Sequence, residues 1–167
     1  PWREKCKYEA ICEGDDYWID PLKLQKQVDV LNDNLDCMLT FHAVKEIYEN
    51  NKSEHIRKVV YGRKYSGVEF YKTRPAQTAS FILRTSIYKD DFYLKKVQGK
   101  FLTGDIPLVL SCSRLGTLIG IPNVMSVYRH NEGGWSSQKR TKDYAWKIAT
   151  NELRYSIFGA EYEMDVN

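Results

Sequence analysis

Short apolar runs alternate along this chain with segments whose apolar residues recur at helical spacing. Strands are predicted at Lys7 to Cys12 (KYEAIC), Cys37 to Phe41 (CMLTF) and Val124 to Tyr128 (VMSVY). Helices are predicted between them, from Asp20-Pro21 to about residue 34 and from Ile106 to Leu115. This alternation favours an α/β sandwich, a class of fold that binds ligands at the carboxyl ends of its strands.

The first predicted helix has a clear start signal. Asp20-Pro21 supplies an N-cap and a proline for the first helical position. Leu24, Val28 and Leu31 then fall at helical spacing, so we expect them to face the core. Lys23 is expected among the surface residues of the same helix.

The remaining elements are predicted from weaker patterns. A polar turn at residues 49–53 is expected to lead into a second hairpin arm at Arg57 to Tyr61. The segment from Gly62 to Pro75 is expected to be a loop with short elements, and Thr78 to Arg84 a strand. Gln138 to Phe158 has the pattern of a long amphipathic helix.

Composition limits the class of protein. The 167 residues suit one domain, and 43% hydrophobic with 28% charged residues is ordinary for a globular protein. A net charge of +3 without a basic stripe argues against a nucleic-acid partner, and no apolar run is long enough to span a bilayer. The four cysteines form no CxxC pair, so buried free thiols in a reducing cytosol are expected.

An acidic turn follows the first predicted strand. Glu13, Asp15 and Asp16 place three carboxylates within four positions, with Gly14 allowing close approach of a ligand. The mutual repulsion of these charges would be offset by a hard divalent cation such as Mg²⁺ or Mn²⁺. Aspartates are also common turn formers ahead of a helix, and the spacing favours neither interpretation over the other.

Two further polar groups lie near predicted element ends. Asp105 stands at the start of a predicted helix, where an aspartate is usually a cap, and the pattern alone favours that role. Arg129 and His130 follow a predicted strand and have the chemistry to hold phosphate, although ordinary surface roles are favoured for such a pair in isolation.

Taken together, these segments resemble a known family. Lys7 to Gln27 (KYEAICEGDDYWIDPLKLQKQ) is similar to the centre of the bacterial inverting glycosyltransferases of family 2. The resemblance continues in the family's order through Thr78 to Thr85 (TASFILRT), Gly104 to Leu108 and Val124 to His130 (VMSVYRH), and covers about residues 7–137. It implies a GT-A fold, a three-layer α/β sandwich with a mixed sheet and an acidic signature at a strand end.

The resemblance assigns roles to the acidic turn. Glu13, Asp15 and Asp16 occupy the family's acidic signature. Asp15 and Asp16 would bind a divalent metal, Mn²⁺ or Mg²⁺, and Asp16 would also lie on the diphosphate side of the donor. Glu13 would face the nucleotide ribose, although the family usually has aspartate at this position.

The same resemblance assigns the catalytic base and a basic pair. Asp105 falls where the family keeps its base, but Gly104 precedes it where the family usually has glutamate. Arg129 and His130 match a basic pair that approaches the diphosphate of the donor. In a single in-line displacement Asp105 would take the proton of an acceptor hydroxyl, and the sugar would invert its configuration.

The resemblance also implies a partial domain. Family members begin with an apolar strand and further elements that bind the nucleotide base, and this sequence has no counterpart of them. We therefore expect residues 1–137 to be a truncated GT-A domain carrying the metal and acceptor side, inactive by itself. Residues 138–167 would be a C-terminal amphipathic helix and tail packed on that domain. An exposed sheet edge near Lys7 to Cys12 would drive self-association as a homo-oligomer.

The expected substrates are a nucleotide-sugar donor and a glycan or lipid-linked acceptor, used in surface polysaccharide synthesis in the cytoplasm at the inner face of the membrane. Acceptor selectivity is expected from Gly62 to Gln77 and from the C-terminal helix. Two alternatives stay open: an inactive carbohydrate- or nucleotide-binding module, and an interaction module of a membrane-bound complex. For the second, the basic residues around Trp146 would supply peripheral membrane contact, although a solvated helix face is favoured there.

Overall fold

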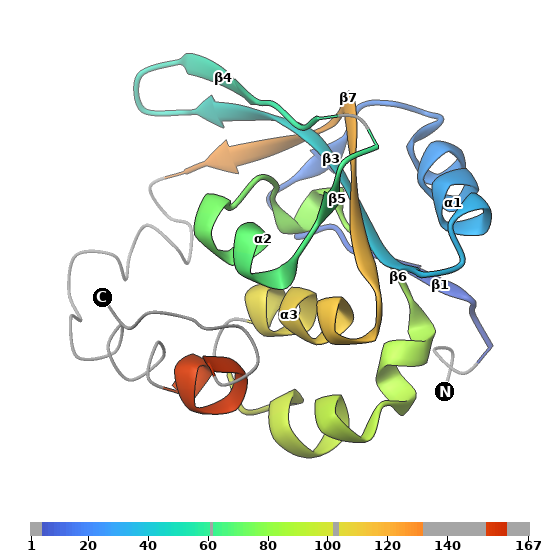
Figure 1. Cartoon of the computed structure of the whole chain (residues 1–167). Coiled ribbons are helices and arrows are strands. Elements are labelled where there is room, and N and C mark those ends of the chain that lie inside the picture. Colours follow the sequence, from blue (N-terminus) through green and yellow to red (C-terminus); the bar gives the residue numbers. More distant parts are fainter. Residues whose placement is uncertain (1–4, 61, 102–103, 132–152, 160–167) are drawn as a thin grey trace.

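Two long parallel strands, β3 (Cys37–Tyr48) and β7 (Thr117–His130), form the centre of the structure (Figure 1). The computed structural model describes residues 5–60, 62–101, 104–131 and 153–159. The other strands are β1 (Tyr8–Ala10), β2 (Tyr17–Trp18), β4 (Ser53–Arg57), β5 (Lys64–Tyr65) and β6 (Ile82–Arg84). The α-helices are α1 (Lys23–Asp33), α2 (Gly67–Thr73) and α3 (Asp105–Leu115), with shorter helical turns at Thr78–Ser80, Thr85–Lys89 and Tyr93–Val97.

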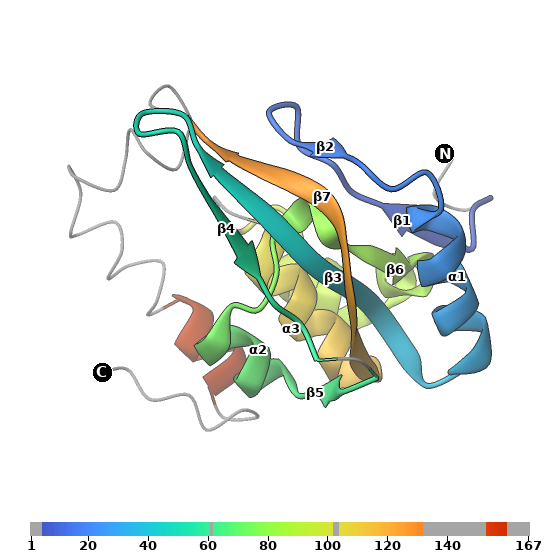
Figure 2. The ribbon, with the colours of Figure 1, turned by 90° about the horizontal axis from the view of Figure 1, so that it is seen from above.

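The strands form one mixed, curled sheet. Its order is β1-β6-β3-β7-β2, with β4 paired to β3 and β5 paired to β7 (Figure 2). Only β3 and β7 run parallel, and every other pairing among the described strands is antiparallel. The predicted α/β class with a mixed sheet is therefore confirmed.

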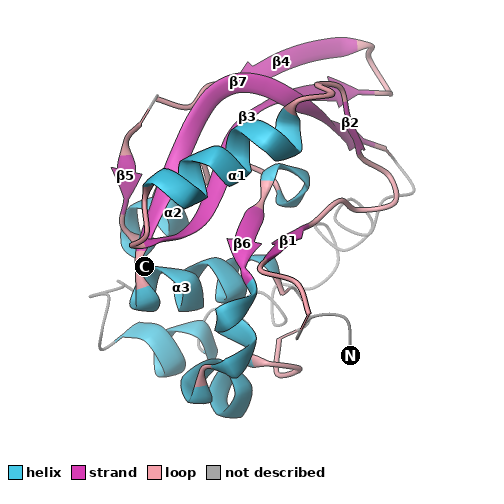
Figure 3. Cartoon of the chain, turned by 90° about the vertical axis from the view of Figure 1, so that its right-hand side faces the viewer, coloured by secondary structure: helices cyan, strands magenta, loops and turns pink. Residues whose placement is uncertain are grey.

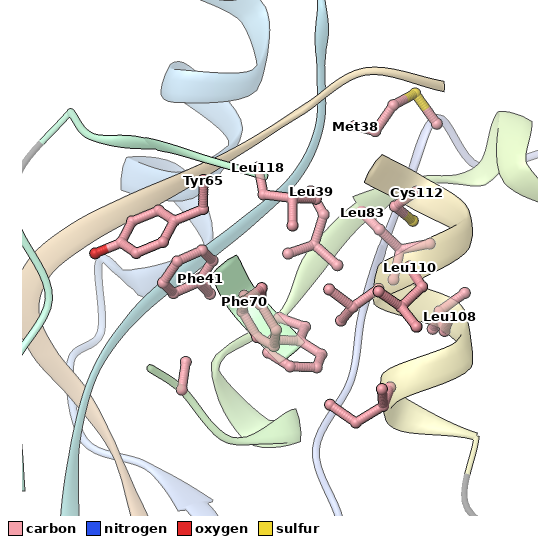
Figure 4. Packing of buried hydrophobic residues seen from close by; sticks show 14 of the residues in the cluster. Met38, Leu39, Phe41, Tyr65, Phe70, Leu83, Leu108, Leu110, Cys112 and Leu118 are labelled. Carbon is pink, nitrogen blue, oxygen red and sulfur yellow. The ribbon is translucent and has the colours of Figure 1, made fainter. Parts of the chain in front are cut away.

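Helices cover both faces of this sheet. Helix α1 lies on one face and α2 and α3 on the other (Figures 1 and 3). The residues of β3 divide between these faces: Leu39 and Phe41 join the large cluster with α2 and α3, whereas Cys37 packs with Leu31 of α1. A register shift between Cys37 and Leu39 interrupts the strand's alternation there. In the large cluster Phe41 makes edge-to-face contacts with Phe70 of α2 at 5.1 Å and Tyr65 of β5 at 5.0 Å between ring centroids (Figure 4).

The prediction for α1 was wrong in its start, and of its predicted buried face only Leu31 is fully buried. The helix begins at Lys23, because Asp20 Oδ1 accepts the backbone N–H of Leu22 at 2.8 Å and holds residues 20–22 in a turn. Lys23, Gln27 and Leu31 face the sheet, while Leu24 is exposed. Tertiary contacts decide this orientation, since the Gln27 amide donates to the backbone carbonyls of residues 40 and 80.

Several other elements differ from their predicted bounds. The hairpin after β3 is confirmed, but its second arm is Ser53–Arg57 rather than 57–61. A helix, Gly67–Thr73, lies within the predicted loop, capped by Ser66 Oγ. Of the strand predicted at 78–84, only Ile82–Arg84 pairs in the sheet.

The predicted C-terminal helix falls mainly outside the described residues, as does the basic stretch around Trp146; residues 153–159 are helical. All four cysteines are free, but only Cys37 and Cys112 are buried, while Cys6 and Cys12 are exposed. No helix in the described parts of the chain combines the length and apolar character needed to cross a membrane.

The junction between α3 and β7 needs a glycine. A Cβ on Gly116 would lie 2.1 Å from the backbone oxygen of Asp36, which accepts the N–H of Thr117 at 2.8 Å. We expect Gly116→Ala to lower the free energy of unfolding by roughly 2–3 kcal/mol, because neither backbone segment can move without breaking this hydrogen bond. Urea denaturation would measure the loss. Gly104→Ala is the control, since a Cβ there meets no atom within 4 Å; a similar loss in both variants would refute the steric argument.

Candidate functional site

The acidic turn connects β1 to β2 and lies beside the C-terminal half of β7. β2 positions it, because Tyr17 and Trp18 pair with Val127 and Ser126 of β7. The turn itself is closed by the Asp16 N–H, which donates to the Glu13 carbonyl oxygen at 3.1 Å. The backbone therefore closes the turn without help from the aspartate side chains.

Arg129 lies against this turn through two hydrogen bonds. Its backbone N–H donates to Asp16 Oδ1 at 3.1 Å, and its Nε donates to the carbonyl oxygen of Asp15. A guanidinium nitrogen also lies 3.6 Å from Glu49 Oε1. The structure thus brings Arg129 together with Asp15 and Asp16, which lie in a distant segment of the sequence. Asp16 is not only a turn former, because its side chain also binds β7.

Asp16 keeps one carboxylate oxygen without a hydrogen bond. The residue is 8% exposed, and its Oδ2 is buried with no partner in the described structure. Burial, together with the charge of Asp15, raises the pKa of Asp16 to about 6, even though Arg129 acts in the opposite direction. A buried acceptor left unpaired is costly, so this oxygen has the chemistry to accept a donor or a cation.

Glu13 and Asp105 come within electrostatic reach of each other. Desolvation raises the pKa of Glu13 to about 6, and the charges of Asp16, Asp105 and Asp15 act in the same direction. Asp105 is the first residue of α3 and is half-buried. The fold therefore brings the predicted base close enough to the acidic turn, from which it is far apart in the sequence, for its charge to act on Glu13.

Asp105 does not cap its helix. Gly104 holds the N-cap position, and no side-chain hydrogen bond caps α3. The capping role that the pattern favoured is wrong, and the Asp105 carboxylate makes no hydrogen bond or ion pair within the described part of the chain.

His130 lies beside a buried carboxylate that the sequence analysis missed. Its ring stacks on Tyr48 with centroids 4.0 Å apart, and its Nε2 is 3.8 Å from Glu46 Oε1. The same oxygen accepts Arg57 at 2.7 Å and Gln77 at 3.3 Å. Burial alone would raise the pKa of Glu46, but these partners and the charge of Arg57 lower it.

A buried lysine near the turn was also missed. Lys23 is 1% exposed, and its Nζ lies 4.3 Å from the centroid of the Trp18 ring, with no hydrogen-bond partner among the described residues. Burial lowers the pKa of Lys23 to about 8 and that of neighbouring His42 to about 4. Trp18 is fixed by its Nε1–H, which donates to the Ala79 carbonyl oxygen at 2.9 Å. Lys23 is buried because it shares the sheet-facing side of α1 with Gln27 and Leu31, an orientation set by tertiary contacts that no sequence pattern marked.

The described residues contain no group of three or more His, Cys, Asp or Glu side chains arranged to hold a metal ion. Asp15 and Asp16 would offer carboxylate oxygens at the turn. A hard divalent cation is coordinated by six or more oxygen atoms. A metal here would therefore require further oxygens from a ligand or from water.

Comparison with known proteins identifies relatives, but these relatives are themselves uncharacterized. No known protein-family profile matches the sequence. The chain is 32% identical over 143 residues to an uncharacterized protein of Mycobacterium bovis and to uncharacterized proteins of two strains of Mycobacterium tuberculosis. The match covers 84% of this chain and 40% of each relative, so the chain spans about two-fifths of their length.

Proposed function

We propose that this chain is the metal- and acceptor-side part of a GT-A glycosyltransferase. The whole protein would transfer a sugar from a nucleotide-diphosphate donor to a glycan or lipid-linked acceptor with inversion. The observation that carries the proposal is the acidic turn, where Asp16 keeps a buried carboxylate oxygen without a hydrogen bond among the described residues and Arg129 of β7 lies against the turn. The charge of Asp105, at the start of α3, also acts on Glu13 in this turn. A donor-side acidic turn and a base from another segment must share one site for this reaction.

The acidic turn fits a divalent cation bound together with a diphosphate. Asp16 Oδ2 is a buried acceptor without a hydrogen bond among the described residues, and Asp15 adds a second carboxylate beside it. Asp15 and Asp16 would hold Mn²⁺ or Mg²⁺, with phosphate oxygens completing the shell. When bound, the cation neutralises negative charge on the departing nucleoside diphosphate.

The remaining residues have distinct tasks in this proposal. Asp105 accepts the proton of the attacking hydroxyl, and its carboxylate makes no hydrogen bond or ion pair in the described structure. Arg129 holds the acidic turn against β7, and its guanidinium adds positive charge on the diphosphate side. Glu13 would accept a hydrogen bond from the nucleotide ribose.

Calorimetry on the full-length protein tests the acidic turn. We expect Mn²⁺ to bind weakly alone and at least tenfold more tightly with UDP or GDP present, because the diphosphate supplies the missing oxygens. Asp15→Ala should remove most of this gain.

Asp29→Ala is the matched control, since it removes an exposed carboxylate of α1 that hydrogen-bonds only Gln25. It should leave the Mn²⁺ affinity unchanged. If Asp15→Ala and the wild type bind Mn²⁺ equally well with the nucleotide present, Asp15 has no role at the metal.

A further inference from the structure

A basic hollow of about 390 Å³ is lined by residues of β4, β5 and α2 and of the segments beside them. Its basic side chains come from β4, α2 and their flanking segments, and Glu69 is the one carboxylate among its lining residues. The basic residues are His55, Arg57, Lys58, Arg63 and Arg74. The volume suits a group the size of one sugar unit rather than an extended polymer.

The positive charge of this hollow is only partly neutralised. Glu69 accepts a hydrogen bond from Arg63, and Arg57 is paired with Glu46 beneath the hollow. Lys58 is exposed and has no hydrogen bond or ion pair in the described structure. The hollow therefore keeps an excess of positive charge directed at solvent, as an anion site does.

Arg74 links the hollow to the candidate catalytic base. It ends α2 in the left-handed conformation, with φ 45°, and its carbonyl oxygen accepts a hydrogen bond from Arg57. Its guanidinium donates to the Tyr71 carbonyl oxygen at 2.8 Å and lies over the Tyr71 ring. Helix α2, which Arg74 ends, packs against α3, which Asp105 begins, and the charge of Asp105 acts on Arg74. Arg74 therefore connects the hollow to the element that carries the candidate base.

We propose that the basic hollow binds an oxyanion group of the sugar acceptor, a phosphate or a carboxylate. Guanidinium groups match both oxyanions in shape and charge. The donor diphosphate is assigned to the acidic turn, which leaves the hollow for the acceptor. This inference rests on the proposed glycosyltransferase function and deepens it, because it names an anionic acceptor.

Binding of small anionic sugars to the full-length protein, without donor or metal, tests the hollow. Glucose 6-phosphate, glucuronate and glucose would be titrated and followed by calorimetry. We expect at least one of the two anions to bind at least tenfold more tightly than neutral glucose. The stronger of the two identifies the oxyanion as phosphate or carboxylate. Equal binding of all three sugars would overturn the proposal.

Two exposed substitutions locate the site without risk to the fold. Lys58→Glu and Arg63→Gln should each weaken anion binding at least fivefold, whereas Lys96→Glu, on an exposed lysine outside the hollow, should not. Unchanged affinity in both hollow variants would overturn the assignment.

A transfer assay separates this inference from the proposed function. Transfer to neutral and anionic acceptors at equal rates would leave the glycosyltransferase intact and refute the anionic acceptor. Anion binding in the hollow of a protein that transfers no sugar would refute the acceptor role and the proposed function together.

Discussion

Replacing Asp105 by asparagine is expected to lower the rate of sugar transfer by about 10²–10⁴-fold in the full-length protein. Asparagine keeps the size of the side chain but cannot accept a proton from the acceptor hydroxyl. Asp105 caps no helix end and makes no hydrogen bond or ion pair in the described structure, so the substitution breaks no such contact. The rate loss therefore reports the chemical step rather than the stability of the fold.

The decisive measurement compares the effect of Asp105→Asn on donor binding with its effect on kcat. The dissociation constant of the nucleotide-sugar should stay within about twofold of the wild type, while kcat falls, because proton removal takes place only in the transition state. Asp91→Asn is the control, as it removes an exposed carboxylate paired with Lys95. Transfer by Asp105→Asn within a few-fold of the wild-type rate would exclude Asp105 as the base.

Replacing Lys23 by methionine is expected to raise the free energy of unfolding by about 1–3 kcal/mol at pH 7. The wild-type ammonium is 1% exposed, with no hydrogen-bond partner among the described residues. Its pKa falls from 10.5 to about 8 on folding, which corresponds to a cost of about 3 kcal/mol for keeping it charged. Its position over Trp18 offsets about 1–2 kcal/mol of this cost.

The advantage of the methionine variant should depend on pH. Since the pKa of Lys23 is lower in the folded state, the unfolded chain binds more protons between about pH 8 and pH 10.5. The stability of the wild type therefore rises with pH across this window, and the difference from Lys23→Met shrinks. Cys12 raises the pKa of Lys23, and the charge of Lys23 lowers the pKa of His42. Both proteins should therefore be compared under reducing conditions, because of Cys12, and above pH 7, because of His42.

Urea denaturation between pH 7 and pH 10 measures this effect. Lys26→Met, on the same helix, removes a partly exposed ion pair with Asp20 and should cost less than about 1 kcal/mol. If Lys23→Met is destabilised at pH 7, the ammonium has a stabilising partner that outweighs the cost of its burial.

Lys23 also helps to position the candidate site. Lys23 contacts Trp18, and Trp18 follows the acidic turn directly and binds the Ala79 carbonyl oxygen. These two contacts of Trp18 therefore hold β2 in place, and with it one end of the turn that carries Asp15 and Asp16.

The sequence determined the order of the main strands and helices, because apolar runs and helical periodicity are local properties of a chain. The helix α3 lies where these patterns predict it, and β1, β3 and β7 overlap their predicted ranges. However, β3 runs on to Tyr48, β7 begins as early as Thr117, and the second arm of the hairpin after β3 is Ser53–Arg57 rather than 57–61. The acidic turn was selected for its three crowded carboxylates, whereas the functional roles of Asp105 and Arg129 came from the resemblance to the glycosyltransferases.

Tertiary structure alone decided which side chains meet and which are buried. The burial of Lys23 follows from the orientation of α1, which the hydrogen bonds of Gln27 help to set and which the apolar periodicity does not contain. The pairing of Glu46 with Arg57 follows from the register of a hairpin. Glu13 comes near Asp105 only because the sheet and α3 fold back on each other, and such long-range packing is set by the whole core rather than by any local segment.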